Sequence, residues 1–283
     1  MLDSKIIIPF IEQALKEDVQ DGDHSSLSCI DPTAIGEAQL IFKSEGIVAG
    51  IELAQTILTY LDKNMQFNRL LKDGDCFEYG TIGFKAKGNV HALLKGERLL
   101  LNCMQRLSAI ATETKKYVDA IKHTQCKVLD TRKTTPNLRY LEKWAVTLGG
   151  GHNHRFGLYD MIMLKDNHID FCGGITKALQ KADDYVKNTL AKPLKIEIET
   201  RNLNEVKEAL ATQIPDRIML DNFSPELIKE AVDIINGAAE TEASGGITLE
   251  TIVKYAETGV NFISVGALTH GVKSLDISFK TVC

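Results

Sequence analysis

Apolar and polar residues follow two different patterns along the chain, one on each side of about residue 110. In the first part, alternating segments predict strands at 37–42, 47–49, 76–79 and 90–94. Apolar residues at helical spacing predict helices near 7–15, over 51–61 and over 96–122. Short strands mixed with helices in this way are typical of an α+β domain with a mostly antiparallel sheet.

The second part repeats a unit in which a short apolar run precedes a helical pattern. The runs are 127–130, 161–165, 195–199, 217–221, 241–244 and 262–266, and the last four end 22 or 23 residues apart. One strand, one short helix and two tight loops need a spacing of about this length. Strands that alternate with helices form parallel sheets through right-handed crossovers. Six such units favour a β/α barrel over an open sheet, and because eight strands cannot be counted, we expect an irregular, incomplete barrel.

Composition narrows the class of protein. The 283 residues suggest about two domains, and 33 Lys and Arg against 38 Asp and Glu leave no basic excess for coating nucleic acid. No apolar run approaches the roughly 18 residues of a membrane span, and the short run before Pro9 is no secretory signal. The chain is therefore expected to be cytoplasmic. Its cysteines lack zinc or redox spacing and are expected to be reduced and mostly buried: Cys29, Cys76, Cys103, Cys126, Cys172 and Cys283.

Charged residues and glycines follow the predicted strands, at the edge where barrel enzymes build their sites. Residues 130–168 hold six Lys or Arg against four Asp or Glu, which indicates an anionic small molecule as ligand. Guanidinium groups bind carboxylate or phosphate through paired hydrogen bonds. The glycines at 149–151 allow the backbone to approach a ligand closely. A metal site at His152 and His154 is not favoured, because no acidic residue or cysteine lies beside them at ligand spacing.

Two glycine turns, at 244–246 and at 266, each follow a strand and precede a helix. Backbone N–H groups in such turns bind phosphate, although neither turn matches a dinucleotide or nucleotide loop. Glu199 and Asp221 lie between the basic segment and these turns. They could stabilise a developing cation or hold a hydrated Mg²⁺ on a diphosphate. A glycosidase also uses two carboxylates, but the cationic segment argues against a neutral sugar as substrate.

Together these motifs resemble the quinolinate phosphoribosyltransferase family, the decarboxylating nicotinate-nucleotide pyrophosphorylases. The resemblance is carried by Asp-Thr-Arg-Lys-Thr at 130–134, Gly-Gly-Gly-His-Asn-His-Arg at 149–155 and Lys-Asp-Asn-His at 165–168. Further matches run in order from residue 17 to about 276. The sequence departs from the family where Ala109 and Asn137 replace the usual glycines.

The resemblance implies an α/β fold: an N-terminal α/β sandwich domain over 1–110, to which 271–283 return, and an irregular β/α barrel over 111–270. It implies the transfer of phosphoribosyl from 5-phosphoribosyl 1-diphosphate to quinolinate with loss of CO₂, giving nicotinate mononucleotide for NAD biosynthesis. Mg²⁺ is expected with the diphosphate, and no residue is assigned to it as a metal ligand. A homodimer or larger assembly is implied, in which Arg98 reaches the neighbouring chain's site. No nucleic acid or membrane partner is expected.

The same resemblance assigns roles to individual residues. The residues expected to bind quinolinate are Arg98, Arg132, Lys133, Thr134, His154, Arg155 and Lys165. Those expected to bind phosphoribosyl diphosphate are Lys133, Lys165, Glu199, Asp221, Ser244, Gly245, Gly246, Val265, Gly266 and Ala267. The catalytic set is Lys133, Lys165, Glu199 and Asp221. No protein nucleophile is expected, because no cysteine falls in a matched motif or beside a histidine.

Two other functions are weighed against this one. A paralogue could transfer phosphoribosyl to nicotinate, but Arg98, Arg132 and Arg155 together favour a substrate with two carboxylates. A barrel that only binds an anion, as a sensor or scaffold, would not need both Glu199 and Asp221.

Overall fold

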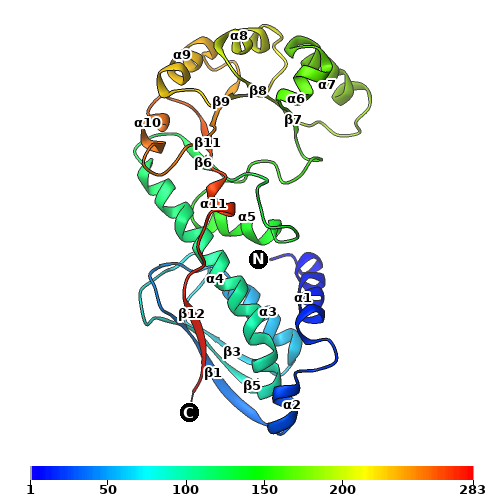
Figure 1. Cartoon of the computed structure of the whole chain (residues 1–283), viewed down its shortest axis with the longest axis vertical. Helices are drawn as coiled ribbons and strands as arrows, with labels where there is room; N and C mark the ends of the chain where they lie inside the picture. Colours follow the sequence, from blue (N-terminus) through cyan, green and yellow to red (C-terminus); the bar gives the residue numbers. More distant parts are fainter. Residues whose placement is uncertain (1, 283) are drawn as a thin grey trace. The chain divides into compact units, whose positions relative to one another are not determined.

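The computed structural model of the chain describes residues 2–282. The chain divides into two compact units, whose elements are labelled in Figure 1. Unit 1 comprises residues 1–113 and 272–283, and unit 2 comprises residues 114–271. Unit 2 is therefore inserted between two segments of unit 1.

Unit 1 combines helices with antiparallel sheets. Its helices are α1 (Ser4–Val19), α2 (His24–Cys29), α3 (Ile51–Leu61) and the first part of α4 (Val90–Ala120). Its strands are β1 (Ile35–Phe42), β2 (Gly46–Ile47), β3 (Gln66–Arg69), β4 (Cys76–Phe77), β5 (Ile82–Asn89) and β12 (Ile277–Thr281). They form a sheet of order β12-β1-β5-β3 and a β2-β4 pair, all antiparallel. The antiparallel α+β domain predicted from the sequence is confirmed.

The core of unit 1 lies between this sheet and helix α3. Leu40, Phe42 and Phe84 point from β1 and β5 into the core and are fully buried. A side chain at Gly83 of β5 would collide with Leu40 and Phe42 and come within 3.4 Å of Ile51 of α3, which shows how closely the helix packs on the sheet. A larger residue at position 83 would therefore force the neighbouring side chains, Phe42 first, to shift.

One predicted strand of unit 1 is wrong, and three observed strands, β3, β5 and β12, were not predicted. Residues 90–94 form the first turns of helix α4 instead of a strand. The Asn89 side chain accepts a hydrogen bond from the Ala92 N–H at 3.2 Å, so Asn89 ends β5 and caps the helix that follows. Strand β5 was missed because glycines at 83 and 88 interrupt the apolar alternation that identifies a strand, and β3 because its four residues, Gln-Phe-Asn-Arg, include a single apolar one.

Unit 2 alternates parallel strands with helices. The strands are β6 (Lys127–Leu129), β7 (Ile162–Leu164), β8 (Ile196–Thr200), β9 (Arg217–Asp221), β10 (Glu240–Ser244) and β11 (Phe262–Ser264). The helices are α5 (Arg139–Leu148), α6 (Asp166–Cys172), α7 (Ile175–Asn188), α8 (Leu203–Ala211), α9 (Pro225–Ile235), α10 (Ile252–Ala256) and α11 (Ala267–His270). All six predicted strands occur where the sequence placed them, within one or two residues at either end.

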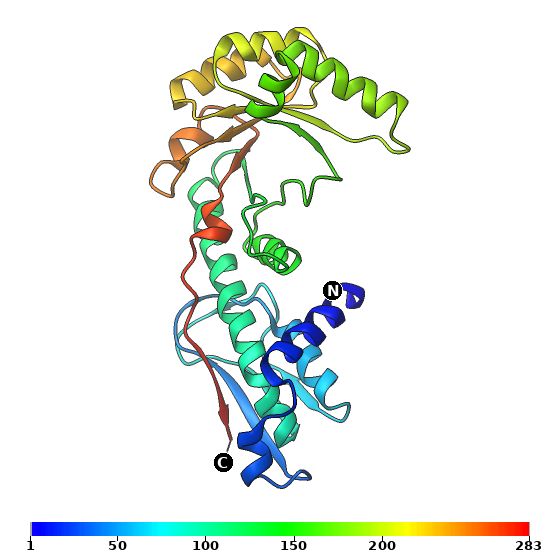
Figure 2. The same ribbon diagram turned by 45° about the vertical axis from the view of Figure 1, so that its right-hand side comes forward.

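The strand order of unit 2 is β6-β11-β10-β9-β8-β7, and every pair in it is parallel. Strands β6 and β7 are the two edges, so the sheet is an incomplete barrel, as expected from the sequence. Figure 2 shows the helices between β7 and β10 on one face of this sheet. All five residues of β8, the strand next to the β7 edge, are buried, because helices cover one face and interior side chains fill the other.

The cysteines differ from expectation. Of those that the structure describes, Cys103 alone is buried, Cys29 and Cys76 are exposed, and Cys126 and Cys172 are intermediate. All five are free thiols, as expected, but the expectation that they are mostly buried is wrong, because only one of them is buried. Cys283 lies outside the described residues. Within residues 2–282, no helix has both the length and the apolar content that a membrane crossing requires.

Candidate active site

A cavity of about 640 Å³ lies at the carboxyl ends of the unit 2 strands. Parallel strands that run in the same direction bring these ends together, and this is where barrel enzymes bind substrate. The residues that line it are Thr131, Arg132, Lys133, His154, Arg155, Met163, Lys165, Glu199, Met219, Asp221, Asn222, Glu242, Ser244, Gly245, Gly246, Ile247, Thr248, Ser264, Val265, Gly266, Ala267 and His270.

A buried ion pair fastens two loops of the cavity together. Lys143 of α5 donates to the carboxylate of Asp130, directly after β6, and neither side chain is more than 1% exposed. Asp130 also accepts from the backbone N–H of His154 at 2.9 Å, while Lys143 donates to the carbonyl of His154 at 3.0 Å. Burial raises the pKa of Asp130 to about 6, against the opposing effect of Lys143. The pair holds the segment that begins at residue 131 against the segment around residue 154.

Two guanidinium groups line the cavity on these loops. Arg155 is 8% exposed and donates to the carbonyl of Met161 at 3.3 Å. Burial and the neighbouring Arg132 both lower the pKa of Arg155, because each disfavours its positive charge. The Nε of Arg132 is buried and has no hydrogen-bond partner among the described residues. These two arginines therefore form a cationic region that lacks a negatively charged partner, and an anionic ligand can supply one.

Thr134 supports this region from outside the cavity. Its hydroxyl accepts from Nε of Arg139 at 3.0 Å, and Arg139 also donates to the Arg132 carbonyl at 3.4 Å. Arg139 in turn donates to the carbonyl of Phe156 at 3.2 Å. Thr134 thus helps Arg139 to brace the backbone that carries Arg132.

The carboxylates predicted to be functional lie at the ends of β8 and β9. Lys165, after β7, donates to Oε2 of Glu199 at 2.9 Å; the lysine side chain is 47% exposed and that of Glu199 is 9% exposed. Asp221 accepts from the amide of Asn222 at 2.6 Å and contacts no Lys or Arg of the described chain. One carboxylate is therefore paired with a cation, and the other remains available to a ligand.

Glycine turns close the other side of the cavity. Gly245 has φ +99°, and a Cβ there would lie 2.2 Å from the Asn222 side-chain oxygen. Gly246 has φ +61° and no atom near the place that its Cβ would occupy. Gly266 lies against Lys133, whose carbonyl accepts from the hydroxyl of Thr269 at 2.8 Å. Backbone at these turns is accessible, which suits a phosphate held by N–H groups.

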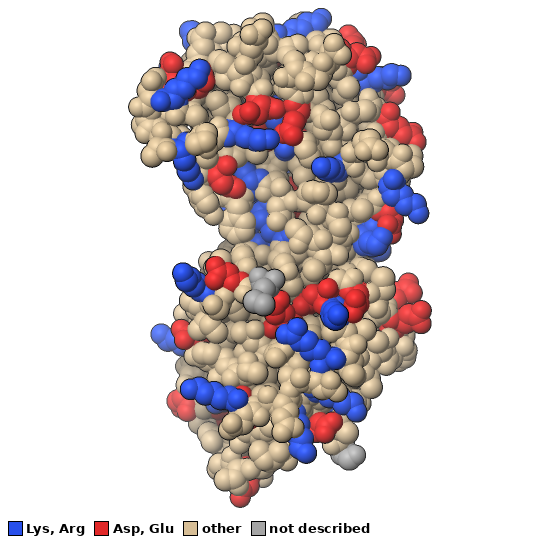
Figure 3. Space-filling model, turned by 180° about the vertical axis from the view of Figure 1, so that it is seen from behind, with Lys and Arg blue, Asp and Glu red and all other residues tan. Residues whose placement is uncertain are grey.

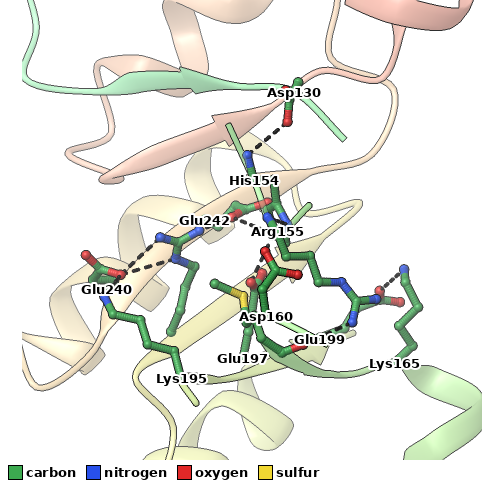
Figure 4. A network of polar contacts seen from close by, with 12 residues as sticks. Asp130, His154, Arg155, Asp160, Lys165, Lys195, Glu197, Glu199, Glu240 and Glu242 are labelled. Carbon is green, nitrogen blue, oxygen red and sulfur yellow. Dashed lines mark hydrogen bonds and ion pairs between the residues drawn. The ribbon is translucent and has the colours of Figure 1, made fainter. Parts of the chain in front are cut away.

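A second group of ionisable side chains lies deeper, inside the sheet (Figure 4). Nε2 of His154 lies 3.0 Å from Glu197 of β8 and 3.5 Å from Glu242 of β10. Arg217 of β9 donates to Glu242 at 2.8 Å and, at its other end, to Glu240 at 3.0 Å. Burial opposes the positive charge of His154, but the two carboxylates outweigh it and raise the pKa of His154 to about 9.

The cavity brings together most of the residues that the sequence singled out. Those in its lining are Arg132, Lys133, His154, Arg155, Lys165, Glu199, Asp221, Ser244, Gly245, Gly246, Val265, Gly266 and Ala267. Thr134 is outside the lining, and Arg98 lies on helix α4 in unit 1, where it is exposed.

Several lining residues were not assigned a role from the sequence, notably Thr131, Glu242, Thr248 and His270. Glu197, beneath the cavity, was part of a recognised motif but received no role. The available signal was that Glu197 and Glu242 each sit within a strand, where an acidic residue needs a buried partner.

Charges of both signs are present on the face of the molecule drawn in Figure 3. On the face drawn in Figure 3, Lys and Arg lie interspersed with Asp and Glu over both units. The concentration of unpaired positive charge is instead found inside the cavity, at Arg132 and Arg155. An anionic small molecule that enters the cavity would meet this charge.

Family models match almost the whole chain. The model described as the quinolinate phosphoribosyl transferase C-terminal domain matches residues 110–280, and the model of the N-terminal domain matches residues 23–108. The match over 110–280 contains every residue of the cavity lining.

Curated relatives and solved structures agree with the family models. A nicotinate-nucleotide pyrophosphorylase [carboxylating] of Arabidopsis thaliana is 46% identical over 286 residues, covering 95% of this chain and 81% of the relative. A probable enzyme of the same name from Bacillus subtilis is 46% identical over 262 residues, covering 93% and 89%. The structure of the nicotinate-nucleotide pyrophosphorylase from Francisella tularensis superposes with a TM-score of 0.92 at 40% identity, covering 100% of this chain and 98% of that one.

Proposed function

This chain belongs to the quinolinate phosphoribosyl transferase family, and we propose that it transfers phosphoribosyl from 5-phosphoribosyl 1-diphosphate to quinolinate. The products are nicotinate mononucleotide, CO₂ and diphosphate, a step of NAD biosynthesis. One observation carries the proposal: a single cavity holds two neighbouring guanidinium groups on one side and two accessible glycine turns on the other. These features suit an aromatic dicarboxylate and a sugar phosphate, respectively.

Quinolinate binds at the cationic side of the cavity. Arg132 and Arg155 supply guanidinium groups, and the unpartnered Nε of Arg132 is available to a carboxylate oxygen. Paired N–H donors of this kind recognise carboxylates with defined geometry. His154 and Lys165 add positive charge at the same side, so both substrate carboxylates can be neutralised.

Phosphoribosyl diphosphate binds at the glycine turns. The 5-phosphate accepts hydrogen bonds from backbone N–H groups at 244–246 and near Gly266, where the backbone is open to the cavity. Lys133 and Lys165 neutralise the diphosphate as it departs. Mg²⁺ bound with the diphosphate would help to neutralise that group, and the carboxylate of Asp221, which pairs with no Lys or Arg of the described chain, is the side chain that would hold the hydrated ion.

The transfer is a displacement at the anomeric carbon of the ribose. The pyridine nitrogen forms the new C–N bond as the bond to diphosphate breaks, through a transition state with oxocarbenium character. Glu199 and Asp221 lie at adjacent strand ends, where they stabilise this developing positive charge. The resulting pyridinium accepts the electron pair of the breaking C–C bond when CO₂ leaves, and a proton then replaces CO₂ on the ring carbon. No protein nucleophile takes part.

Arg98 completes the site from a second copy of the chain. It is exposed on helix α4 of unit 1 and is absent from the cavity lining. In a homodimer, a guanidinium from the partner would add a third donor group for the dicarboxylate. Mixing inactive Arg98→Ala chains with inactive Lys165→Ala chains should restore partial activity in heterodimers. No restored activity in heterodimers shown to form would refute the shared site.

One assay tests the reaction itself. Purified protein is incubated with quinolinate, phosphoribosyl diphosphate and Mg²⁺, and nicotinate mononucleotide and CO₂ are measured. Turnover of nicotinate but not of quinolinate would establish the paralogous reaction instead. Tight binding of quinolinate without any product would favour an anion-binding protein.

The cytoplasmic location stays a prediction. The chain's relatives include an enzyme of Arabidopsis thaliana that is named as chloroplastic and one of Nicotiana glauca that is named as mitochondrial. Fractionation of cells that produce the chain, followed by immunoblotting of each fraction, tests it directly.

A further inference from the structure

Asn222 lines the cavity but has no part in the transfer as described so far. It follows directly after strand β9, and its φ of +58° lies in the left-handed region that residues with a side chain rarely adopt. Four other described non-glycine residues have a positive φ, and none of them lines the cavity. Such a conformation costs free energy and is often found at functional sites, which makes Asn222 a candidate for a functional role.

The backbone of Asn222 joins the ends of two neighbouring strands. Asp221, the last residue of β9, lies opposite Ser244, the last residue of β10. The N–H of Asn222 donates to the Ser244 carbonyl at 2.8 Å, which continues the pairing of these strands by one residue. This hydrogen bond reaches the first residue of the 244–246 turn, where the 5-phosphate is proposed to bind. The place of Asn222 relative to that turn is therefore fixed.

The side-chain amide of Asn222 contacts both sides of this junction. On one side, its Nδ2 donates to Oδ2 of Asp221 at 2.6 Å. On the other side, a Cβ added at Gly245 would lie 2.6 Å from Cγ of Asn222 and 2.8 Å from its backbone nitrogen. The amide and the backbone of Asn222 are therefore packed directly against the turn, while the same amide holds the carboxylate.

An amide is suited to this position because it is uncharged and carries N–H donors. Donation to a carboxylate fixes the orientation of that carboxylate without neutralising its charge. With Oδ2 held in this way, Oδ1 is the oxygen of Asp221 that is available to a ligand. An aspartate at position 222 would instead place a second carboxylate against Asp221, and a glycine would leave Asp221 without this donor.

We propose that Asn222 is a positioning residue that holds the Asp221 carboxylate at a fixed place relative to the 244–246 turn. The inference rests on the proposed function for its substrate. When the turn holds the 5-phosphate, the ribose carbon that reacts is aligned with the carboxylate that stabilises its positive charge. Binding of the 5-phosphate, which does not react, thereby contributes to the rate of transfer. The left-handed backbone of Asn222 and the two contacts of its amide carry the argument.

Asn222→Gly separates this role from that of a simple turn residue. Asparagine tolerates a positive φ better than most residues, and glycine adopts it without strain, so a residue that only makes the turn can be replaced by glycine. Under the proposal, the single-turnover rate of Asn222→Gly should instead fall about 10- to 100-fold, as for a misaligned reacting group. Calorimetry should show ribose 5-phosphate binding within about threefold of wild type, and the KM for quinolinate should stay within about twofold.

Asn236→Gly is the matched control. Asn236 also has a left-handed backbone, with φ +44°, but it ends helix α9 and lies outside the cavity lining. The same substitution there should leave the single-turnover rate unchanged, and the Tm of both variants should stay within about 3 °C of wild type. Equal losses of rate in the two variants, or a rate of Asn222→Gly within twofold of wild type, would overturn the inference.

Two further variants test whether Asn222 acts through Asp221. Asn222→Asp keeps the shape of the side chain but repels the carboxylate, so its rate should be at least as low as that of Asn222→Gly. Addition of Asn222→Gly to Asp221→Asn should lower the rate by less than about threefold beyond Asp221→Asn alone, because the carboxylate to be positioned is already absent. A rate of Asn222→Asp above that of Asn222→Gly, or fully additive losses in the double variant, would contradict the proposal.

The amide can also be observed by NMR without turnover. With asparagine side chains labelled with ¹⁵N, the Asn222 signals are assigned by their absence in Asn222→Gly. We expect them to shift in Asp221→Asn, which changes the acceptor, and to shift in the wild type when ribose 5-phosphate is added. The absence of either shift would overturn the inference. A wild type that forms no nicotinate mononucleotide would instead refute the proposed function, and it leaves this measurement unaffected.

Discussion

Removal of the buried ammonium of Lys143 should destabilise the protein strongly. Lys143 and Asp130 are both almost completely buried, and the lysine is the only side-chain cation that contacts Asp130 in the part of the chain described. In Lys143→Met, methionine fills the space of the aliphatic chain, but the carboxylate loses its partner. The perturbation is therefore mainly electrostatic and creates little empty space.

The magnitude follows from the burial of the pair. Breaking a buried ion pair by removing one partner costs about 3–5 kcal/mol, a large part of the roughly 5–15 kcal/mol that stabilises a typical domain. The pKa of Asp130 is about 6 in the folded protein, above its ordinary 3.8, because burial outweighs Lys143. Without Lys143 this pKa rises further. When folding raises the pKa of a carboxyl group, the free energy of unfolding falls as pH rises through the range between the unfolded and folded pKa values. The loss of stability in Lys143→Met relative to wild type should therefore be larger at pH 8 than at pH 5.

Urea unfolding at both pH values measures these free energies. Asp130→Asn/Lys143→Met removes both charges and should be about 1–3 kcal/mol more stable than Lys143→Met alone at pH 8. A loss below about 1 kcal/mol in Lys143→Met, or a double variant no more stable than the single one, would refute the reasoning. So would a deficit that is the same at pH 5 and pH 8.

Three further predictions concern the cavity and its floor. Gly245→Ala places a Cβ against Asn222 at a residue with φ +99°, so the KM for phosphoribosyl diphosphate should rise about tenfold or more, while the KM for quinolinate stays within twofold of wild type. Equal rises in the two KM values would contradict the binding of the phosphate at this turn. Glu199→Gln should lower kcat by about 10²–10³-fold in single-turnover kinetics, while calorimetry shows that quinolinate still binds. A kcat within threefold of wild type would exclude Glu199 from stabilising the positive charge of the transition state. Folding raises the pKa of His154 from 6.5 to about 9, so protonation of His154 stabilises the folded protein by roughly 3 kcal/mol below pH 6.5, and this stabilisation is lost between pH 6.5 and 9. The difference in free energy of unfolding between wild type and Glu197→Gln should therefore shrink over that range, and a constant difference would contradict the prediction.

The sequence predicted the barrel strands well because their signal is local and repeated. Strands β9, β10 and β11 are short, buried and followed by short helices, so their ends recur at nearly constant spacing. The start of α4 was mistaken for a strand because residues 90–94 are apolar enough for either element. The cap at Asn89 decides between them, and it depends on a hydrogen bond that the pattern alone does not reveal.

The cavity was predictable where function depends on strand ends. Glu199 and Asp221 follow directly from the rule that parallel strands converge at their carboxyl ends. The partners of His154 were not predictable in the same way. Whether Glu197 and Glu242 face the interior depends on strand register and on which strands become neighbours, and the order β8-β9-β10 is a property of the folded sheet.

The interrupted course of unit 1 affects how the chain folds as it is synthesised. Strand β12 pairs with β1 along five residues, from Phe42 opposite Ile277 to Ala38 opposite Thr281. A ribosome makes β1 early and β12 only after all of unit 2, so β1 has one unpaired edge for most of translation. Unit 2, whose strands are continuous in sequence, can fold first. The unpaired edge of β1 can pair with strands of other nascent chains, so slow translation of the segment that contains β12 prolongs the time in which aggregation can occur.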